Sequence, residues 1–276
     1  MTEFNDRTRQ HYQANVSNQN ELLAKISAIV DGMGSGPLTA AKLSGVDQFH
    51  VGGLTATVEF AKRIGISAAM NVLDAGSGLG GPSRYLAETF GCHVEGVDLT
   101  PAYVAVADLL TKRAGLADKV RSQVGDLTNL PFGDATFDLV WTQHVVMNIP
   151  DRAAVNREFR RVVKPNGRLA FYDVLASDGK PTPHYPTPWA ETAEMSTLLT
   201  EAETRTELGA AGFAVAKWDD VTKDAFGWMS QQLPPVPGAN GPGLIVGPRI
   251  GEMVSNFRRN LEEGRVRLVL AVCEAV

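Results

Sequence analysis

From residue 70 onward, short apolar or β-branched runs alternate with helical segments, and this alternation constrains the fold more than any other feature. The runs are Met70–Asp74, Val94–Leu99, Val120–Val124, Phe137–Thr142, Arg168–Val174, Ala214–Trp218 and Arg265–Cys273. The helical segments are Pro82–Phe90, Ala102–Ala114, Arg152–Val163, Ala202–Ala211 and Pro248–Glu263. Repeated strand–helix units form an open, mostly parallel sheet with helices on both faces. The sequence therefore predicts an α/β fold with a seven-stranded, mostly parallel sheet whose last strand is antiparallel.

The segments outside this alternation predict a cap and two insertions. Helical patterns over about residues 6–32 and 40–64 precede the first strand, so we expect an N-terminal helical cap at 1–66 and a core at 67–276. Two segments without periodicity lie at about 177–196 and 231–247. Long irregular segments inside a domain are often lids over a site. We expect residues 1–53 and 177–196 to form a mobile lid.

Composition excludes several classes of function. Lys and Arg number 26 against 31 Asp and Glu, a net charge of −5 without a basic run, so nucleic acid is not expected as a partner. No apolar run has the length of a membrane span, and the polar start lacks a signal-peptide core. The two cysteines, Cys92 and Cys273, suggest no disulfide framework. We expect a cytoplasmic protein without a metal site, and its oligomeric state stays open.

A glycine-rich turn follows the first strand and opens the next helix. Glycines 76, 78 and 80 allow a tight turn and a close approach of the backbone to a ligand. The N–H groups at the start of the helix can face an anionic group. The same stretch also satisfies G-x-G-x-x-G through Gly81, so this pattern alone leaves a dinucleotide site equally open.

Polar residues also end the next three strands of the predicted sheet. Asp98 ends the second strand, where a carboxylate can accept both hydroxyls of a ribose. Asp126 ends the third, where it can accept from an exocyclic amine such as that of adenine. Gln143 and His144 end the fourth. Ligands of such sheets bind outside the carboxyl ends of the strands, so these residues predict one shared crevice.

Taken together, these motifs resemble the class I S-adenosylmethionine-dependent methyltransferases, whose sheet is Rossmann-like. The matching segments are Val72–Gly81, Asp98, Gly125–Leu127, Phe137–Trp141 and Arg161–Arg168. The resemblance is greatest to small-molecule enzymes: sarcosine/dimethylglycine N-methyltransferases, ubiquinone/menaquinone-type C-methyltransferases and antibiotic-sugar O-methyltransferases. Asp47–Gly53 also resembles the short segment that these enzymes place over the cofactor. The resemblance fades after about Leu175.

The resemblance implies S-adenosyl-L-methionine as the cofactor, S-adenosyl-L-homocysteine as the product, and a role for each matching residue. The methionyl part would be held by Asp74, Gly76, Ser77, Gly78 and Gly80. Asp98 and Leu99 would hold the ribose, Asp126 and Leu127 the adenine, and Gln143 and His144 would lie near the sulfonium. Many O-methylating relatives carry a histidine pair after the fourth strand, but here residues 146–151 contain no such base.

The remaining candidate residues are those that could accept a proton during catalysis and those that could contact the substrate. His144 is the candidate base, because an imidazole with a pKa near about 6.5 suits proton transfer near pH 7. Asp173 would hold its ring, and His50 is a further catalytic candidate or a cofactor contact. His184, Tyr185, Trp189 and Met147 are expected to contact the substrate. Each also has a structural alternative, as a wall, capping or core residue.

The sequence thus predicts transfer of a methyl group to an N, O or C nucleophile of a small molecule by in-line displacement. A nicotinamide-dependent oxidoreductase shares the glycine turn and Asp98, but the chain lacks Tyr-x-x-x-Lys and that function does not explain Gly125–Leu127. A non-catalytic cofactor-binding protein on the same fold is a further alternative. The identity of the acceptor stays open.

Overall fold

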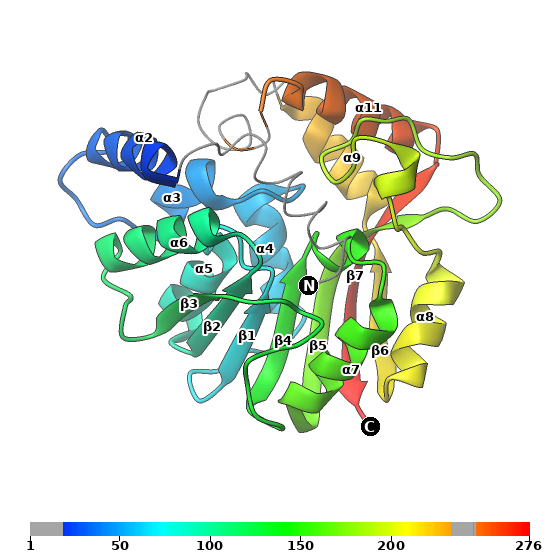
Figure 1. Ribbon diagram of the computed structural model, residues 1–276, viewed down its shortest axis with the longest axis horizontal. Helices are drawn as coiled ribbons and strands as arrows, with labels where there is room; N and C mark the ends of the chain where they lie inside the picture. Colours follow the sequence, from blue (N-terminus) through cyan, green and yellow to red (C-terminus); the bar gives the residue numbers. More distant parts are fainter. Residues whose placement is uncertain (1–18, 233–244, 246) are drawn as a thin grey trace.

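A computed structural model describes residues 19–232, 245 and 247–276 (Figure 1). Within these residues the sheet has seven strands in the order β3-β2-β1-β4-β5-β7-β6. The strands are β1 (Asn71–Ala75), β2 (His93–Asp98), β3 (Val120–Val124), β4 (Phe137–Gln143), β5 (Val163–Ala176), β6 (Phe213–Asp220) and β7 (Val266–Ala275). Only β7 runs antiparallel to its neighbours, β5 and β6. The predicted fold class is confirmed, including its antiparallel last strand.

Helices cover both faces of the sheet. Before β1 the chain forms α2 (Gln19–Asp31), α3 (Ala40–Asp47) and α4 (Gly53–Lys62). Later helices are α5 (Gly81–Phe90), α6 (Pro101–Arg113), α7 (Arg152–Val162), α8 (Glu201–Ala210), α9 (Thr222–Gln231) and α11 (Ile250–Glu262), with short 3-10 turns η1 (Val146–Asn148) and η2 (Ala193–Met195). The sequence did not predict α9, a ten-residue helix in which only Ala225 and Met229 are buried.

The order of the strands places a crevice between β1 and β4. From β1 the chain moves outward to β2 and β3, then returns to the other side of β1 as β4. Neighbouring loops diverge at such a reversal, which opens a binding crevice at the carboxyl ends of the strands. Figure 1 shows α3 and α6 on one side of this edge and α9 and α11 on the other.

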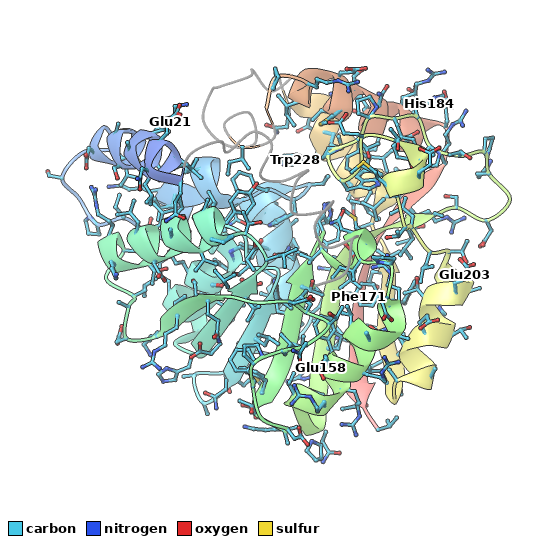
Figure 2. The ribbon with its side chains drawn as sticks, in the orientation of Figure 1. Glu21, Glu158, Phe171, His184, Glu203 and Trp228 are labelled. Carbon is cyan, nitrogen blue, oxygen red and sulfur yellow. The ribbon has the colours of Figure 1, made fainter. Side chains whose placement is uncertain are left out.

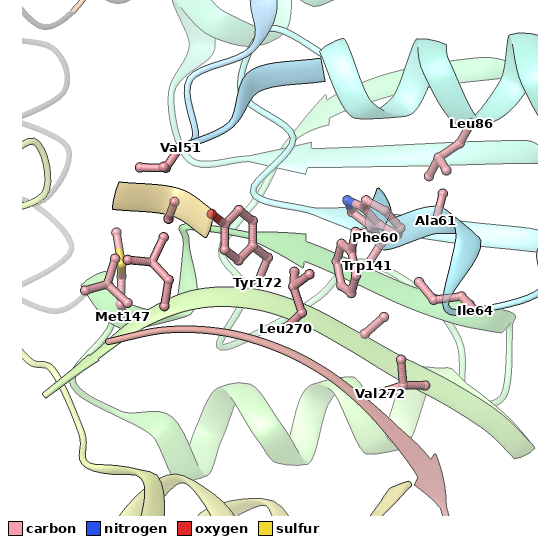
Figure 3. Packing of buried hydrophobic residues seen from close by; sticks show 14 of the residues in the cluster. Val51, Phe60, Ala61, Ile64, Leu86, Trp141, Met147, Tyr172, Leu270 and Val272 are labelled. Atoms are coloured by element: carbon pink, nitrogen blue, oxygen red, sulfur yellow. The ribbon is translucent and has the colours of Figure 1, made fainter. Parts of the chain in front are cut away.

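One core cluster runs from the middle of the sheet to this edge (Figure 3). At its inner end Phe60 of α4 packs on Trp141 of β4 with ring centroids 4.2 Å apart. At its outer end Figure 3 shows Val51, Met147 and Tyr172. The elements that carry the crevice residues are therefore fixed by the same core that holds α4 on the sheet.

The N-terminal helices pack on the core through a second cluster. Leu22, Ile26 and Val30 of α2 are buried together with Val106 and Leu110 of α6. α2 is therefore part of a packed core, at variance with the expectation that all of residues 1–53 move as a lid. Residues 6–18 of the first predicted helix, and most of the predicted insertion 231–247, lie outside the described residues. The division at residue 66 stays a prediction.

None of the described helices combines the length and the apolar character needed to cross a bilayer. The cytoplasmic location expected from the sequence stays a prediction.

Candidate functional site

A cavity of about 600 Å³ lies at the carboxyl ends of β1, β2 and β4. Most of the residues predicted for the site line it. They are His50, Asp74, Gly76, Ser77, Gly78, Asp98, Leu99, Asp126, Leu127, Gln143, His144, Met147 and Trp189. Gly80, Asp173, His184 and Tyr185 are not part of its lining. Gly80 is the residue that precedes α5, with φ of 75°.

The glycine turn holds its shape through backbone hydrogen bonds and close packing. The N–H groups of Gly76 and Ser77 both donate to the carbonyl of Val97 in β2, at 2.8 and 3.0 Å. A Cβ on Gly76, where φ is +79°, would lie 2.3 Å from Val145 Cγ2. A Cβ on Gly78, where φ is +52°, would meet nothing within 4 Å. Gly76 therefore serves packing, whereas Gly78 leaves space open in the cavity.

Asp98 and Asp74 lie on either side of this turn. One oxygen of Asp98 accepts from the N–H of Gly78 at 2.9 Å and the other from the N–H of Thr100 at 2.8 Å. Asp74 accepts from Ser83 Oγ at 2.5 Å. Burial raises the pKa of Asp98, and it raises that of Asp74 to about 7, with the charge of Asp98 adding to the shift. These bonds fix both carboxyl groups at the cavity wall.

Asp126 is fixed in a similar way at the end of β3. Its Oδ1 accepts from the N–H and the hydroxyl of Thr128, at 2.9 and 2.8 Å. Leu127, the next residue, is buried and lines the cavity. Consecutive strands β1, β2 and β3 thus each contribute an acidic or apolar group to one wall.

Asp47, the last residue of α3, lies against the start of α5 and is held there by a buried ion pair. Asp47 accepts from Arg84 of α5 at 2.8 Å, and both side chains are fully buried. Arg84 also donates to the carbonyls of Leu79, at 2.6 Å, and Ala107, at 3.2 Å. Burial raises the pKa of Asp47 to about 6, although Arg84 acts in the opposite direction. This pair connects the segment before α4 to the first turn of α5.

Two imidazoles and a phenol gather where β4 and β5 end. The ring centroids of His144 and Tyr172 are 4.6 Å apart, and His50 lies 6.1 Å from His144 and 6.2 Å from Tyr172. His50 Nε2 lies 2.9 Å from Gln48 Oε1 and 3.0 Å from Thr57 Oγ1. His144 has φ of +55°, and its buried Nε2 has no hydrogen-bond partner among the described residues.

Burial keeps both imidazoles neutral. It lowers the pKa of His50 to about 4. It lowers the pKa of His144 well below its usual value, and the charged form of His50 would lower it further. The expectation of an ordinary pKa near about 6.5 for His144 therefore does not hold in this environment.

Asp173 is not brought to the His144 ring. Its Oδ2 accepts from the backbone N–H of Met147 at 2.9 Å, and it lines a separate cavity of about 40 Å³ together with Arg152. Side chains alternate between the two faces of a strand, so Tyr172 reaches the histidines while Asp173 points away from them. Burial raises the pKa of Asp173 to about 7, and Arg152 opposes that shift. Asp173 therefore fixes the turn η1 rather than the imidazole.

The predicted substrate contacts divide into two groups. Trp189 is buried and packs edge-to-face on Phe257 with centroids 4.8 Å apart. His184 faces Glu263 instead, with Nε2 2.9 Å from Oε2, and Figure 2 shows it on the outer side of the molecule. Tyr185 is half-buried beside it and packs against the core cluster. Only Trp189 and Met147 of this group line the cavity.

The sequence did not place α11 at the cavity, where it builds a wall together with Trp228 and Met229 of α9. We call it the α9–α11 wall; its members are Trp228, Met229, Ile250, Gly251, Val254, Ser255, Phe257 and Arg258. Figure 2 shows Trp228 on the inner side of α9, and its Cζ2 would lie 3.9 Å from a Cβ on Gly53. The sequence shows the helical spacing of apolar residues in α11, but this spacing does not indicate which of those residues face a cavity.

Comparison with known proteins agrees with this geometry. Residues 73–171 match the model of a methyltransferase domain family. The match supports the methyltransferase interpretation over the nicotinamide-dependent alternative.

Relatives extend the comparison beyond this domain. Methyltransferase GfsG of Streptomyces halstedii is 35% identical over 132 residues, 48% of each chain. A glycine/sarcosine/dimethylglycine N-methyltransferase of Actinopolyspora halophila is 38% identical over 118 residues, 43% of this chain and 21% of the relative. The solved geranyl diphosphate C-methyltransferase of Streptomyces coelicolor A3(2), with S-adenosyl-L-homocysteine bound, has a TM-score of 0.72 at 16% identity and covers 100% of this chain and 99% of that one. The chain spans half or less of these curated relatives, and the structural likeness shows a shared fold.

Proposed function

We propose that this protein transfers the methyl group of S-adenosyl-L-methionine to an N, O or C nucleophile of a small-molecule acceptor. One observation carries the proposal. A single cavity joins the Gly76–Gly78 turn, Asp98 and Asp126 at one end to the apolar α9–α11 wall at the other. Such a cavity has polar groups for a nucleoside beside apolar surface for a second molecule.

The residues present fit S-adenosyl-L-methionine. The hydroxyl of Ser77 and the amide Nε2 of Gln143 are buried at the cavity without a partner among the described residues. Gly78, which lines the same cavity, has open space where a Cβ would lie. Buried polar groups usually have partners, so these two groups are suited to the polar atoms of a ligand. When bound, the cofactor supplies an electrophilic methyl group on a sulfonium.

Under this proposal the chain itself aligns the acceptor and excludes water. Asp98 binds the ribose hydroxyls and Asp126 the adenine amine. His144, with a neutral ring and an unpartnered Nε2, contacts the acceptor nucleophile, and His50 supports it from the segment over the cofactor. Alignment of this kind supplies up to about 7–11 kcal/mol of the barrier. Asp173 acts through η1 and is a positioning residue.

Calorimetry tests the cofactor part of the proposal. We expect S-adenosyl-L-methionine and S-adenosyl-L-homocysteine to bind and NADH not to bind. Asp98→Ala removes the carboxylate at the cavity and should weaken binding by about 1–3 kcal/mol. Glu95→Gln, three residues earlier on β2 and outside the lining, is the matched control and should bind as the wild type does. Binding of NADH alone would refute the proposal.

Mass spectrometry with a panel of amines, phenols and acidic carbon compounds tests the transfer itself. A product heavier by one methylene unit, formed only with S-adenosyl-L-methionine present, is the expected result. Cofactor binding without any transfer across the panel would favour the non-catalytic alternative.

A further inference from the structure

The α9–α11 wall carries one charged residue among its eight members, Arg258. On α11, residues 250, 251, 254, 255, 257 and 258 line the cavity, as the helical repeat allows. Three of the other side chains are apolar, those of Ile250, Val254 and Phe257, and Ser255 carries a hydroxyl. The guanidinium therefore lies on a mostly apolar surface, where a charge is costly unless a partner meets it.

The neighbouring arginines show that Arg258 is an exception. Within residues 249–267, each of the other four arginines forms an ion pair with a carboxylate. Arg259, one position further and off the cavity face, pairs with Glu263 at 2.6 Å. Among the described residues, Arg258 has no carboxylate partner.

The hydrogen bonds of Arg258 leave part of its guanidinium unused. Its Nη2 donates to the carbonyl of Met229 in α9 at 2.5 Å, which orients the side chain. Its Nε is buried and has no partner among the described residues. A guanidinium offers five donors in a fixed planar fork that matches the two oxygens of a carboxylate or phosphate.

The acidic residues of the cavity lie elsewhere. Asp74, Asp98 and Asp126 line the wall formed by β1, β2 and β3, and Asp47 is already paired with Arg84. His50 and His144 are neutral because burial lowers their pKa values. Among the described residues, the positive charge on the α9–α11 wall is therefore not balanced by a nearby carboxylate.

We infer that the acceptor is a largely apolar molecule carrying one oxyanion, a carboxylate or phosphate, which Arg258 binds. That this molecule is the methyl acceptor rests on the proposed function, whereas the presence of an oxyanion site on the α9–α11 wall does not. A neutral apolar molecule would leave the guanidinium without a charged partner, and a cationic one would be repelled.

Equilibrium binding to the protein loaded with S-adenosyl-L-homocysteine tests this inference without any methyl transfer. The probes are 2-naphthoate, 2-naphthyl phosphate and the neutral 2-naphthamide, measured by calorimetry. We expect at least one of the two anions to bind about 10- to 100-fold more tightly than the amide. The tighter of the two anions distinguishes a carboxylate from a phosphate.

Three variants assign the effect to one residue. Arg258→Met should abolish the preference for the anion, whereas Arg258→Lys keeps the charge and should retain part of it. Arg259→Met, on the outer face of the same helix, is the matched control and should leave the preference unchanged. Thermal unfolding checks that each variant is folded, and Arg258→Lys keeps the test valid should Arg258→Met unfold.

Three results would overturn the inference: equal binding of anion and amide, a preference that survives in Arg258→Met, or binding of neither anion. Failure of methyl transfer with intact anion binding would instead contradict the proposed function and leave the oxyanion site standing.

Discussion

The Nε2 atom of His144 is buried and has no hydrogen-bond partner among the described residues. Because burial lowers its pKa well below 6.5, it carries no charge at neutral pH. We therefore expect the rate of the wild-type protein to show no acid limb from this residue between about pH 6 and 9. His144→Gln should lower turnover about tenfold through misalignment, with the same shape of profile. An acid limb near pH 6.5 that disappears in the variant would contradict this.

Two glycines of the same turn should respond differently to alanine. In Gly76→Ala the new Cβ collides with Val145, so overpacking adds to the strain of a positive φ, and we expect a loss of about 2–4 kcal/mol in the free energy of unfolding. In Gly78→Ala only the strain remains, about 1–2 kcal/mol, because its Cβ meets open space. Urea denaturation measures both. Equal losses would show that the contact with Val145 does not matter.

Residues at strand ends were predictable because a local pattern locates them. Asp98 and Asp126 each follow a recognisable run, and the structure places both on the cavity wall. Asp173 was not predictable in the same way, because one position along β5 decides between the cavity face and the opposite face. Nor did His184 reveal its partner, since Glu263 lies 79 positions away in the chain.

At the scale of elements, the buried pair of Asp47 and Arg84 connects the segment before α4 to α5. Asp47→Asn leaves the guanidinium without its charge partner inside the protein, so we expect the free energy of unfolding to fall by about 3–5 kcal/mol. Asp31→Asn breaks an exposed ion pair with Arg113 of similar length, 2.7 Å. This substitution should change the free energy of unfolding by about 1 kcal/mol or less. Similar effects of the two substitutions in urea denaturation would contradict the role given to the buried pair.

Helix α2 provides a second test at this scale. Ile26 is fully buried against α6, so Ile26→Ala should cost about 2–4 kcal/mol of unfolding free energy. Deleting residues 1–30 removes Leu22 and Val30 as well and should cost more. The expectation that such a deletion affects turnover more than stability is therefore not supported by this packing. A deletion with wild-type stability would show that α2 can leave the core.

The positions of helices and strands along the chain were more predictable than the contacts between them. All seven strands lie close to their predicted ranges, because alternation of buried runs and helices is a local signal. Helix α9 was missed because its ten residues bury only two side chains, too few for a periodic pattern. The α9–α11 wall depends on how two such helices pack together, which no local pattern contains.

For the whole molecule, buried histidines and buried carboxyl groups change the free energy of unfolding in opposite directions as the pH falls. His50 has a folded pKa of about 4, below the value of about 6.5 in an unfolded chain. The unfolded state therefore takes up its proton first, and stability falls as the pH drops from about 6.5 toward 4. Asp74 has a folded pKa of about 7, above its unfolded value, so its contribution becomes more favourable as the pH falls from about 7. The wild-type stability should consequently depend only weakly on pH in this range.

The variant His50→Gln separates the two effects. It retains polar contact with Gln48 and Thr57 but removes the proton uptake of residue 50, while His144 and the buried carboxyl groups are unchanged. Between pH 7 and pH 5 the unfolding free energy of the variant should rise relative to that of the wild type by about 2 kcal/mol, from about 1.4 kcal/mol for each pH unit below 6.5. Urea denaturation at the two pH values measures this difference, and His93→Gln, at an exposed position on β2, is the matched control. A variant whose stability changes with pH as the wild type does would mean that His50 takes up its proton in the folded protein, and therefore that the cavity admits water to the ring.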